Sequence, residues 1–151
     1  MMRLTKYFTV SLAVFVLDQV TKYLITFKLT LYDVVPITSF FNIVSARNLG
    51  SAFSTFQSLG NPIFITITLI ALVVIIVLMI KSDKREALSY SLLLGGAAGN
   101  LFDRIVRGSV VDFLDFHIGS YHWPAFNIAD SALTIGIFYI ILNQFVLVKR
   151  H

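Results

Sequence analysis

The chain has 151 residues, of which 57% are hydrophobic and only 13% charged, and its mean hydropathy is +0.83. A soluble domain usually carries about 25% charged residues, so this composition argues against a soluble core and favours a single compact unit embedded in lipid. No cysteine is present, which excludes disulfides, thiolate nucleophiles and cysteine-based metal sites, and the net charge of +4 comes from basic residues scattered between apolar runs, which argues against nucleic-acid binding.

Four apolar segments are long enough to be membrane-spanning helices, which need about 17–25 residues. They cover about residues 7–27, 62–80, 87–106 and 126–148. The second carries no charge and begins with Pro62, which suits a first helical turn. The third has the weakest signal, because it becomes polar at Asn100. The first could be a cleaved signal peptide, but Asp18 and Lys22 lie where such a peptide is apolar, so a retained helix is expected.

Basic residues predict how these helices are oriented. Seven of them lie at the two termini and in the loop after the second helix: Arg3, Lys6, Lys81, Lys84, Arg85, Lys149 and Arg150. Basic residues gather on the cytoplasmic side of membrane proteins. Both termini are therefore expected in the cytoplasm, and segments 28–61 and 107–125 are expected outside.

The two outer segments are more than simple loops. Residues 28–61 contain strand-like runs at 34–35 and 40–44, and a short amphipathic turn is expected near 52–56. Residues 107–125 include Tyr121 and Trp123, which are typical of a membrane interface. These segments are therefore expected to form a small structured region above the membrane.

Most acidic residues gather at the same outer side. Six of the eight lie in the outer segments or at the outer ends of the predicted helices: Asp18, Asp33, Asp103, Asp112, Asp115 and Asp130. The simple topology of four helices does not require this gathering. It therefore marks the outer face as the place to look for chemistry.

Asp112 and Asp130 are the first candidates. Asp130 lies about one turn inside the fourth helix, where a carboxylate costs about 2.5–3.5 kcal/mol in lipid and is functional by default. Two carboxyl groups brought close together share a proton, and such a pair can act as base and acid on one water molecule. The alternative is that Asp130 pairs with an arginine and only joins helices. The pattern itself leaves these two interpretations open.

Several other polar residues have structural interpretations beside functional ones. Asp18 and Lys22 are spaced i, i+4 with the acid first, which predicts a helical ion pair. Asp103 follows a run of small residues that permits close helix packing, and an ion pair or helix cap is expected for it rather than catalysis. Asn48 and Gly50 indicate either a turn or a contact to an extended substrate.

The remaining acidic and histidine residues carry no clear pattern. Asp33 and Asp115 are expected to be solvated. His117, His122 and His151 lack any metal-binding spacing, so no metal site is expected.

Five motifs together resemble bacterial lipoprotein signal peptidase, also called signal peptidase II. They are Asp18-Gln-Val-Thr-Lys22, Asn48-Leu-Gly-Ser-Ala-Phe53, Gly95-Gly-Ala-Ala-Gly-Asn-Leu-Phe-Asp-Arg104, Val110-Val-Asp-Phe113 and Trp123-Pro-Ala-Phe-Asn-Ile-Ala-Asp130. They occur in the family's order and spacing and extend over nearly the whole chain. One such motif is a weak signal, but five in order are highly specific.

The resemblance implies an aspartic endopeptidase of the bacterial plasma (inner) membrane. The family removes signal peptides from prolipoproteins by cleaving before a cysteine that bears a diacylglyceryl group. Its catalytic aspartates match Asp112 and Asp130. Residues that contact substrate or orient this pair match Asn48, Gly50, Asn100, Arg104 and Asn127. Residues that support the site match Asp18, Lys22 and Asp103.

The resemblance also implies a fold and a set of partners. The fold is an all-α membrane protein with four transmembrane helices, a small extracytoplasmic β-cradle and a short amphipathic helix over the site. No metal or cofactor is expected. The expected partners are a lipidated prolipoprotein, membrane lipid and the cyclic peptide antibiotic globomycin, and a monomer is expected.

A proton-coupled membrane carrier is the alternative function. Asp18, Asp103 and Asp130 would then be relay sites for protons. A relay should cross the whole bilayer, however, whereas these acids gather at one face. Four helices without an internal repeat are also few for a carrier.

Overall fold

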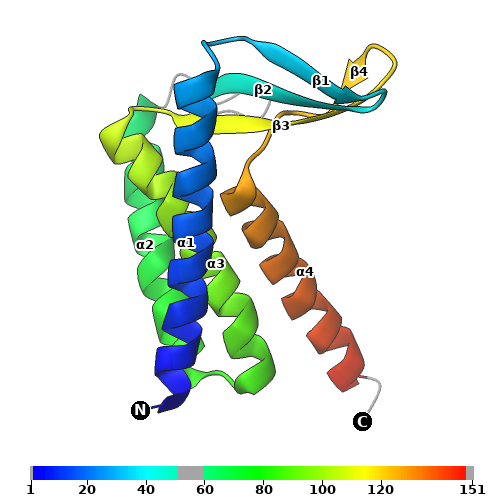
Figure 1. Cartoon of the computed structure of the whole chain (residues 1–151). Coiled ribbons are helices and arrows are strands. Elements are labelled where there is room, and N and C mark those ends of the chain that lie inside the picture. Colours follow the sequence, from blue (N-terminus) through cyan, green and yellow to red (C-terminus); the bar gives the residue numbers. More distant parts are fainter. Residues whose placement is uncertain (1, 51–59, 149–151) are drawn as a thin grey trace.

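Four long helices stand side by side beneath a small β-sheet in the computed structural model, which describes residues 2–50 and 60–148 (Figure 1). The helices are α1 (Met2–Lys28), α2 (Gly60–Lys81), α3 (Lys84–Val106) and α4 (Ile128–Val148). The strands are β1 (Val34–Thr38), β2 (Phe41–Asn48), β3 (Val110–Ile118) and β4 (Tyr121–His122). The protein is therefore mostly helical with a small antiparallel sheet, and all four predicted helices are present. The amphipathic turn predicted near 52–56 lies outside the described residues.

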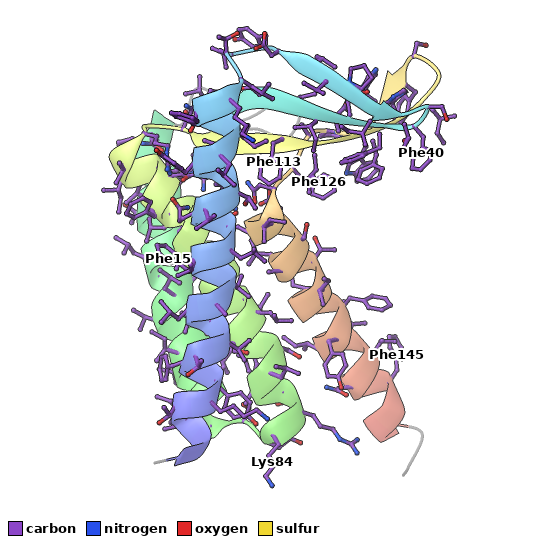
Figure 2. The ribbon with its side chains drawn as sticks, viewed as in Figure 1. Phe15, Phe40, Lys84, Phe113, Phe126 and Phe145 are labelled. Atoms are coloured by element: carbon purple, nitrogen blue, oxygen red, sulfur yellow. The ribbon has the colours of Figure 1, made fainter. Side chains whose placement is uncertain are left out.

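The helices present apolar surfaces outward, as expected for contact with lipid (Figure 2). Leu12 of α1, Ile70 of α2 and Phe145 of α4 are 61%, 62% and 66% exposed. Among the described residues, α2 and the part of α1 from Leu4 to Lys28 are long and apolar enough to cross a membrane. The apolar part of α4 is shorter, Ile128–Asn143. The four-span prediction is thus supported directly for two helices.

The central helix α3 packs against α1, α2 and α4. Its run of small residues explains how two of these neighbours, α1 and α4, approach so closely. A Cβ atom on Gly95 would lie 2.5 Å from the Ser11 carbonyl oxygen of α1, and one on Gly96 would lie 2.6 Å from the Ala129 carbonyl oxygen of α4. Because α3 is enclosed by protein, its polar side chains meet other side chains instead of lipid.

The sheet is antiparallel with strand order β1-β2-β3-β4. The β2–β3 register places Ala46 opposite Asp112 and Asn48 opposite Val110, with an irregularity between Ile43 and Ala46. This pairing brings the end of β2 next to Asp112 of β3. The sheet therefore joins two outer segments that are far apart in sequence.

The strand β3 was not predicted from the sequence. Its first four residues are all buried, so apolar and polar positions do not alternate as they do in a half-buried strand. Strands β1 and β2 extend beyond the predicted runs at 34–35 and 40–44. Pairing with β2 decides the strand conformation of β3, and this pairing is invisible in the local sequence.

One side of the sheet carries a chain of aromatic contacts. Phe116 lies 4.7 Å from Phe41, 5.9 Å from Phe126 and 6.5 Å from Phe40, measured between ring centroids. Phe40 and Phe126 lie below the sheet in Figure 2, on the side of the helices. This layer connects the sheet to the segment that leads into α4.

Both ends of the described chain lie far from the sheet (Figure 1). The short turn between α2 and α3 lies at the same end, and Asp83 caps α3 there by accepting hydrogen bonds from the backbone N–H groups of Arg85 and Glu86. The sheet and the basic ends thus occupy opposite ends of the helix bundle.

Replacing Gly99 by alanine should destabilise the bundle. A Cβ atom at this position would lie 2.5 Å from Asp18 Oδ2, so α1 and α3 would have to separate. Overpacking of this kind costs about 1–3 kcal/mol. A lower melting temperature in detergent is expected for Gly99→Ala. The control Ala13→Val enlarges an exposed position of α1 and should leave the melting temperature nearly unchanged.

Candidate functional site

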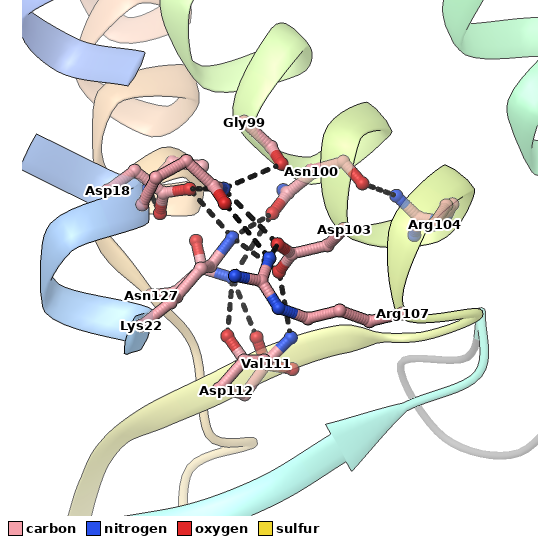
Figure 3. A network of polar contacts seen from close by, with 12 residues as sticks. Asp18, Lys22, Gly99, Asn100, Asp103, Arg104, Arg107, Val111, Asp112 and Asn127 are labelled. Carbon is pink, nitrogen blue, oxygen red and sulfur yellow. Dashed lines mark hydrogen bonds and ion pairs between the residues drawn. The ribbon is translucent and has the colours of Figure 1, made fainter. Parts of the chain in front are cut away.

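A fully buried lysine joins α1 to α3 beside the start of β3 (Figure 3). Lys22 Nζ lies 2.8 Å from Asp18 Oδ2 and 2.9 Å from Asp103 Oδ2, and it donates to Asn100 Oδ1 at 3.0 Å. The ion pair expected between Asp18 and Lys22 is therefore present, and Asp103 is in an ion pair as expected. All three donor positions of the ammonium are occupied.

A second cation balances the charge of this cluster. Arg107 pairs with Asp103, and its Nη1 also donates to Gln19 Oε1 at 2.9 Å. Gln19 Nε2 in turn donates to Asp18 Oδ2 at 3.1 Å and to Asp103 Oδ1 at 3.2 Å. Two buried carboxylates are thus matched by two cations. The roles of Gln19 and Arg107 were not predicted, although Asp103 and Arg107 have the i, i+4 spacing of a helical ion pair.

The cluster also positions the backbone that carries the candidate aspartates. Asp18 Oδ1 accepts a hydrogen bond from the Ala129 N–H at 2.9 Å, at the start of α4. Asp103 Oδ2 accepts one from the Val111 N–H at 3.1 Å, at the start of β3. Asp112 and Asp130 follow these two anchored residues directly in sequence. Their backbones are therefore held to the same buried cluster.

Three asparagines direct their amide nitrogens at these two aspartates. Asn48 Nδ2 donates to Asp112 Oδ2 at 3.1 Å, and Asn127 Nδ2 donates to Asp112 Oδ1 at 2.8 Å. Asn100 Nδ2 donates to Asp130 Oδ1 at 2.7 Å. Asn127 Nδ2 also lies 3.2 Å from Asn100 Oδ1, which links the two sets of contacts.

The orientation of each amide is fixed by a partner that can only donate. Asn48 Oδ1 accepts from the Gly50 N–H at 2.9 Å, Asn100 Oδ1 accepts from the Lys22 ammonium, and Asn127 Oδ1 accepts from the Asp130 N–H at 2.9 Å. Because each oxygen faces a donor, each –NH₂ group must face the other way. The carboxyl oxygens are what these –NH₂ groups meet.

Asn127 and Asp130 form a reciprocal cap at the start of α4. Asn127 Oδ1 accepts the Asp130 N–H, and the Asn127 backbone N–H donates to Asp130 Oδ2 at 3.3 Å. This is the geometry of a capping box, here made by asparagine and aspartate. It places the Asp130 carboxylate beside the positive end of the α4 dipole.

The environment of Asp112 favours its protonated form. The side chain is almost fully buried, and this burial, together with the negative charge of nearby Asp130, raises the pKa of Asp112 to about 7 against the opposing effect of the hydrogen bonds from Asn48 and Asn127. A carboxyl group with this pKa can exchange a proton near neutral pH, as a general acid or base does.

A cavity of about 800 Å³ opens beside the two aspartates. It is lined by Ala46, Arg47, Asn48, Asp112, Trp123, Pro124, Ala125, Phe126, Asp130, Ser131, Thr134 and Ile135. Its walls run from the polar ends of β2 and β3 down the face of α4. The structure thus brings Asp112 and Asp130 to one cavity, with Asn127 hydrogen bonded to both.

Of the five predicted contact residues, Asn48 lines this cavity, whereas Gly50, Asn100, Arg104 and Asn127 are not among its lining residues. The Arg104 guanidinium lies 5.4 Å from the centroid of the Phe64 ring, and its buried Nε has no hydrogen-bond partner among the described residues. Gly50 is buried with φ +118°, and a side chain there would collide with the same ring. Glycine is needed at this position for the backbone conformation and for the space.

The prediction that Asp115 is solvated is wrong. Asp115 is only 5% exposed, accepts a hydrogen bond from Asn42 Nδ2 at 2.7 Å, and lies 2.9 Å from His122 Nδ1. Burial alone would raise the pKa of Asp115, but the hydrogen bonds from Asn42 and His122 outweigh it and hold the pKa below its usual value. Its partners come from β2 and β4, so the pairing depends on the sheet. Asp33 is exposed, as predicted.

A metal site in a protein without cysteine needs several acidic or histidine side chains close together. Within residues 2–50 and 60–148, no group of three or more such side chains could hold a metal ion.

The chain is similar to proteins of known family. A family model described as signal peptidase (SPase) II matches residues 10–146. A protein named lipoprotein signal peptidase from Francisella tularensis subsp. novicida (strain U112) is 48% identical over 143 residues, which cover 90% of this chain and 89% of the relative. Another of that name, from Alteromonas mediterranea, is 40% identical over 146 residues, 93% of this chain and 80% of the relative.

A solved structure, described as a bacterial membrane enzyme determined by the in meso method, is similar in fold. Its TM-score is 0.85 at 37% identity, and the match covers 93% of this chain and 88% of that one.

The buried Asp115 should contribute to stability in a pH-dependent way. Because its folded-state pKa is depressed, the contribution is present above the ordinary aspartate pKa and is lost as the pH falls through the folded value. Asp115→Asn should cost about 1 kcal/mol near neutral pH, since His122 is half exposed, and this cost should shrink as the pH falls below the ordinary aspartate pKa. Melting temperatures of both proteins across this range give the measurement. Asp33→Asn serves as the exposed control, and an equal loss in both variants would contradict the role of Asp115.

Proposed function

The chain belongs to the signal peptidase II family of membrane-embedded lipoprotein signal peptidases, and from this premise we propose that it is an aspartic endopeptidase whose catalytic pair is Asp112 and Asp130. The observation that carries the proposal is the meeting of the two carboxyl groups at one cavity, with Asn127 bonded to both. The family membership makes the chain a peptidase. The aspartic type rests on the geometry of this pair.

The proposed substrate is a prolipoprotein that already carries a diacylglyceryl group on its cysteine. The chain would cleave the peptide bond just before that cysteine. The shape of the cavity supports this choice, because its polar end is made by the sheet and its other end by Thr134 and Ile135 on α4. An extended peptide would contact the sheet end, while lipid chains would remain beside the exposed apolar face of the helices.

The proposed reaction uses one water molecule and the two carboxyl groups. The ionised aspartate takes a proton from water as it attacks the carbonyl carbon, and the protonated aspartate donates to the carbonyl oxygen. The C–N bond then breaks: the leaving nitrogen receives the proton that the first aspartate took from water, and one hydroxyl of the tetrahedral intermediate returns its proton to the other aspartate. Every step needs only one shared proton, which fits an Asp112 pKa near neutrality.

The other residues of the site have supporting parts in this proposal. Asn48, Asn100 and Asn127 orient the two carboxyl groups through the hydrogen bonds described above. The buried Nε of Arg104, which has no hydrogen-bond partner among the described residues, is a donor that a bound water molecule could satisfy. The cluster of Asp18, Lys22 and Asp103 holds the start of α4 and of β3 in place.

We further propose that all four helices span the bacterial plasma membrane as one domain and one monomer. Both described chain ends lie at the end of the bundle opposite the sheet, as an even number of spans requires (Figure 1). The basic turn between α2 and α3 lies at that end too, which supports a cytoplasmic location for it. The catalytic pair would then face the outer side, where lipidated precursors arrive.

The distribution of polar groups argues against a proton-coupled carrier. Asp18, Asp103 and Asp130 belong to one connected network at the sheet end of the bundle. A carrier needs relay groups along the full depth of the membrane. Cleavage of a lipopeptide by purified protein, without an ion gradient, separates the two functions.

Replacing either catalytic aspartate by asparagine should abolish cleavage. Asp112→Asn and Asp130→Asn each remove a group that must both accept and donate a proton, so a loss of at least about 10³-fold in kcat is expected. The assay is cleavage of a fluorescent diacylglyceryl-modified peptide by purified protein, and globomycin is expected to inhibit it. Asp33→Asn should retain full activity. Normal turnover in either catalytic variant would overturn the assignment.

Cleavage should also decline on the alkaline side of neutrality. Because the pKa of Asp112 is raised to about 7, the pair loses its shared proton as the pH rises through this value. The profile of kcat/KM, which reports the free enzyme, should fall about tenfold per unit above this point. A profile that stays flat to about pH 9 would show that no group with this pKa is needed.

A further inference from the structure

The two aspartates of the pair do not have equivalent surroundings. Each accepts two N–H donors, so the number of hydrogen bonds does not distinguish them. The nature of the donors does. Asp130 lies in the first turn of α4, at the positive end of the helix dipole, whereas Asp112 lies on a strand, which has little net dipole.

One of the two donors to Asp130, the Asn100 amide, is itself polarised by a buried cation. Lys22 Nζ donates to Asn100 Oδ1 at 3.0 Å, and Asn100 Nδ2 donates to Asp130 Oδ1 at 2.7 Å. Hydrogen bonds in such a chain strengthen one another, and a charged first donor strengthens the chain further. Asp112 receives its bonds from Asn48 and Asn127, whose Oδ1 atoms accept hydrogen bonds from the neutral backbone N–H groups of Gly50 and Asp130.

From this geometry, and resting on the proposed function, we infer that Lys22 is a positioning residue for catalysis. Its ammonium holds the Asn100 amide in the one orientation that donates to Asp130. Asp130 is therefore the ionised carboxylate that takes the proton from water, and Asp112 is the protonated partner. A lysine outside the cavity thus decides which aspartate is the base.

The inference depends on the donor character of Lys22 as well as on its charge. Without the lysine, Asn100 Oδ1 keeps only the longer contact from Asn127 Nδ2 at 3.2 Å, so the Asn100 amide turns more readily and can present its oxygen to Asp130. An amide oxygen that faces a carboxyl group can accept a hydrogen bond from it only when that carboxyl group is protonated. The turned amide therefore favours the protonated form of Asp130. The roles of the two aspartates would then be exchanged or lost.

Other charged groups also face the pair and must be held constant. The charge of Lys22 acts on both aspartates from α1, Asp18 acts on Asp130, Arg104 acts on both aspartates from α3, and the two aspartates act on each other. The through-space charge of Lys22 therefore does not separate the aspartates, whereas its hydrogen bond to Asn100 does. Asp103 completes the set, because it faces Lys22 directly. A test that removes Lys22 alone would leave two buried acids with one cation.

The experiment therefore removes one negative and one positive charge together. The double variants Asp18→Asn/Lys22→Met and Asp18→Asn/Lys22→Gln have the same net charge in the cluster. Methionine and glutamine are similar in length, but only glutamine can donate to Asn100 Oδ1. Folding of both is checked by melting temperature and by elution from a sizing column.

The acidic limb of the pH profile for cleavage is the measured quantity. The methionine variant should move this limb upward by about one pH unit, the size of shift that a hydrogen bond to a charged form produces. The glutamine variant should show a smaller upward shift, because it keeps the donor to Asn100 Oδ1 although the lysine charge is lost. Equal profiles for the two variants would overturn the inference, because a purely through-space charge would not distinguish them.

A second measurement applies if the methionine variant does not fold. Wild-type protein labelled with ¹⁵N-asparagine is titrated, and the Asn100 side-chain signal is identified by its loss in Asn100→Ser. Its –NH₂ resonance should shift on the acidic limb as Asp130 takes up a proton. An Asn100 –NH₂ signal that ignores this titration would overturn the inference. A different result would contradict the proposed function itself, namely cleavage of the lipopeptide by Asp130→Asn.

Discussion

The burial of the Lys22 ammonium is the constraint on which the rest of the site depends. A charge with no access to water is tolerated only when its donors are all paired. Here the partners are two carboxylates and one amide oxygen, drawn from α1 and α3. The close approach of these helices, which the small residues of α3 permit, is what allows three partners to reach one ammonium.

Hydrogen bonds connect this buried cluster to Asp112 and Asp130, the proposed catalytic pair. The two carboxylates that pair with Lys22 also accept the backbone N–H groups of Val111 and Ala129, each one residue before a candidate catalytic aspartate. The amide that pairs with Lys22 donates to Asp130 itself. Both the backbone and the side chains of the pair are therefore oriented by one buried cluster. If the proposed catalytic pair is correct, a site built this way is organised before substrate arrives.

Much of the helical part could be predicted because the determinants are local. Long apolar runs predict the helices, and the i, i+4 spacing of Asp18 and Lys22 predicts their ion pair. The Asn127-x-x-Asp130 spacing also contains the pattern of a capping box, a signal that could have placed both residues at a helix start.

The sheet and its contacts were harder to predict from the sequence, because their determinants are far apart along the chain. Strand β3 is buried on both faces where it begins and so lacks an alternating pattern. Asp115 is buried because Asn42 and His122 come to it from other strands. The orientation of Asn100 follows from a lysine 78 residues away, which no local pattern reveals. The family motifs include Asn100 but not Asn42, Asp115 or His122, so the contacts are what show how these residues act on one another.

The central claim is that one proton is shared by the pair and rests on Asp112. Infrared difference spectra, recorded between about pH 5 and about pH 9, report the carbonyl stretch of any carboxyl group that titrates around the Asp112 pKa of about 7. Wild-type protein should show a band from a protonated carboxyl group, and this band should disappear in Asp112→Asn. A titrating band that survives in Asp112→Asn would contradict the claim.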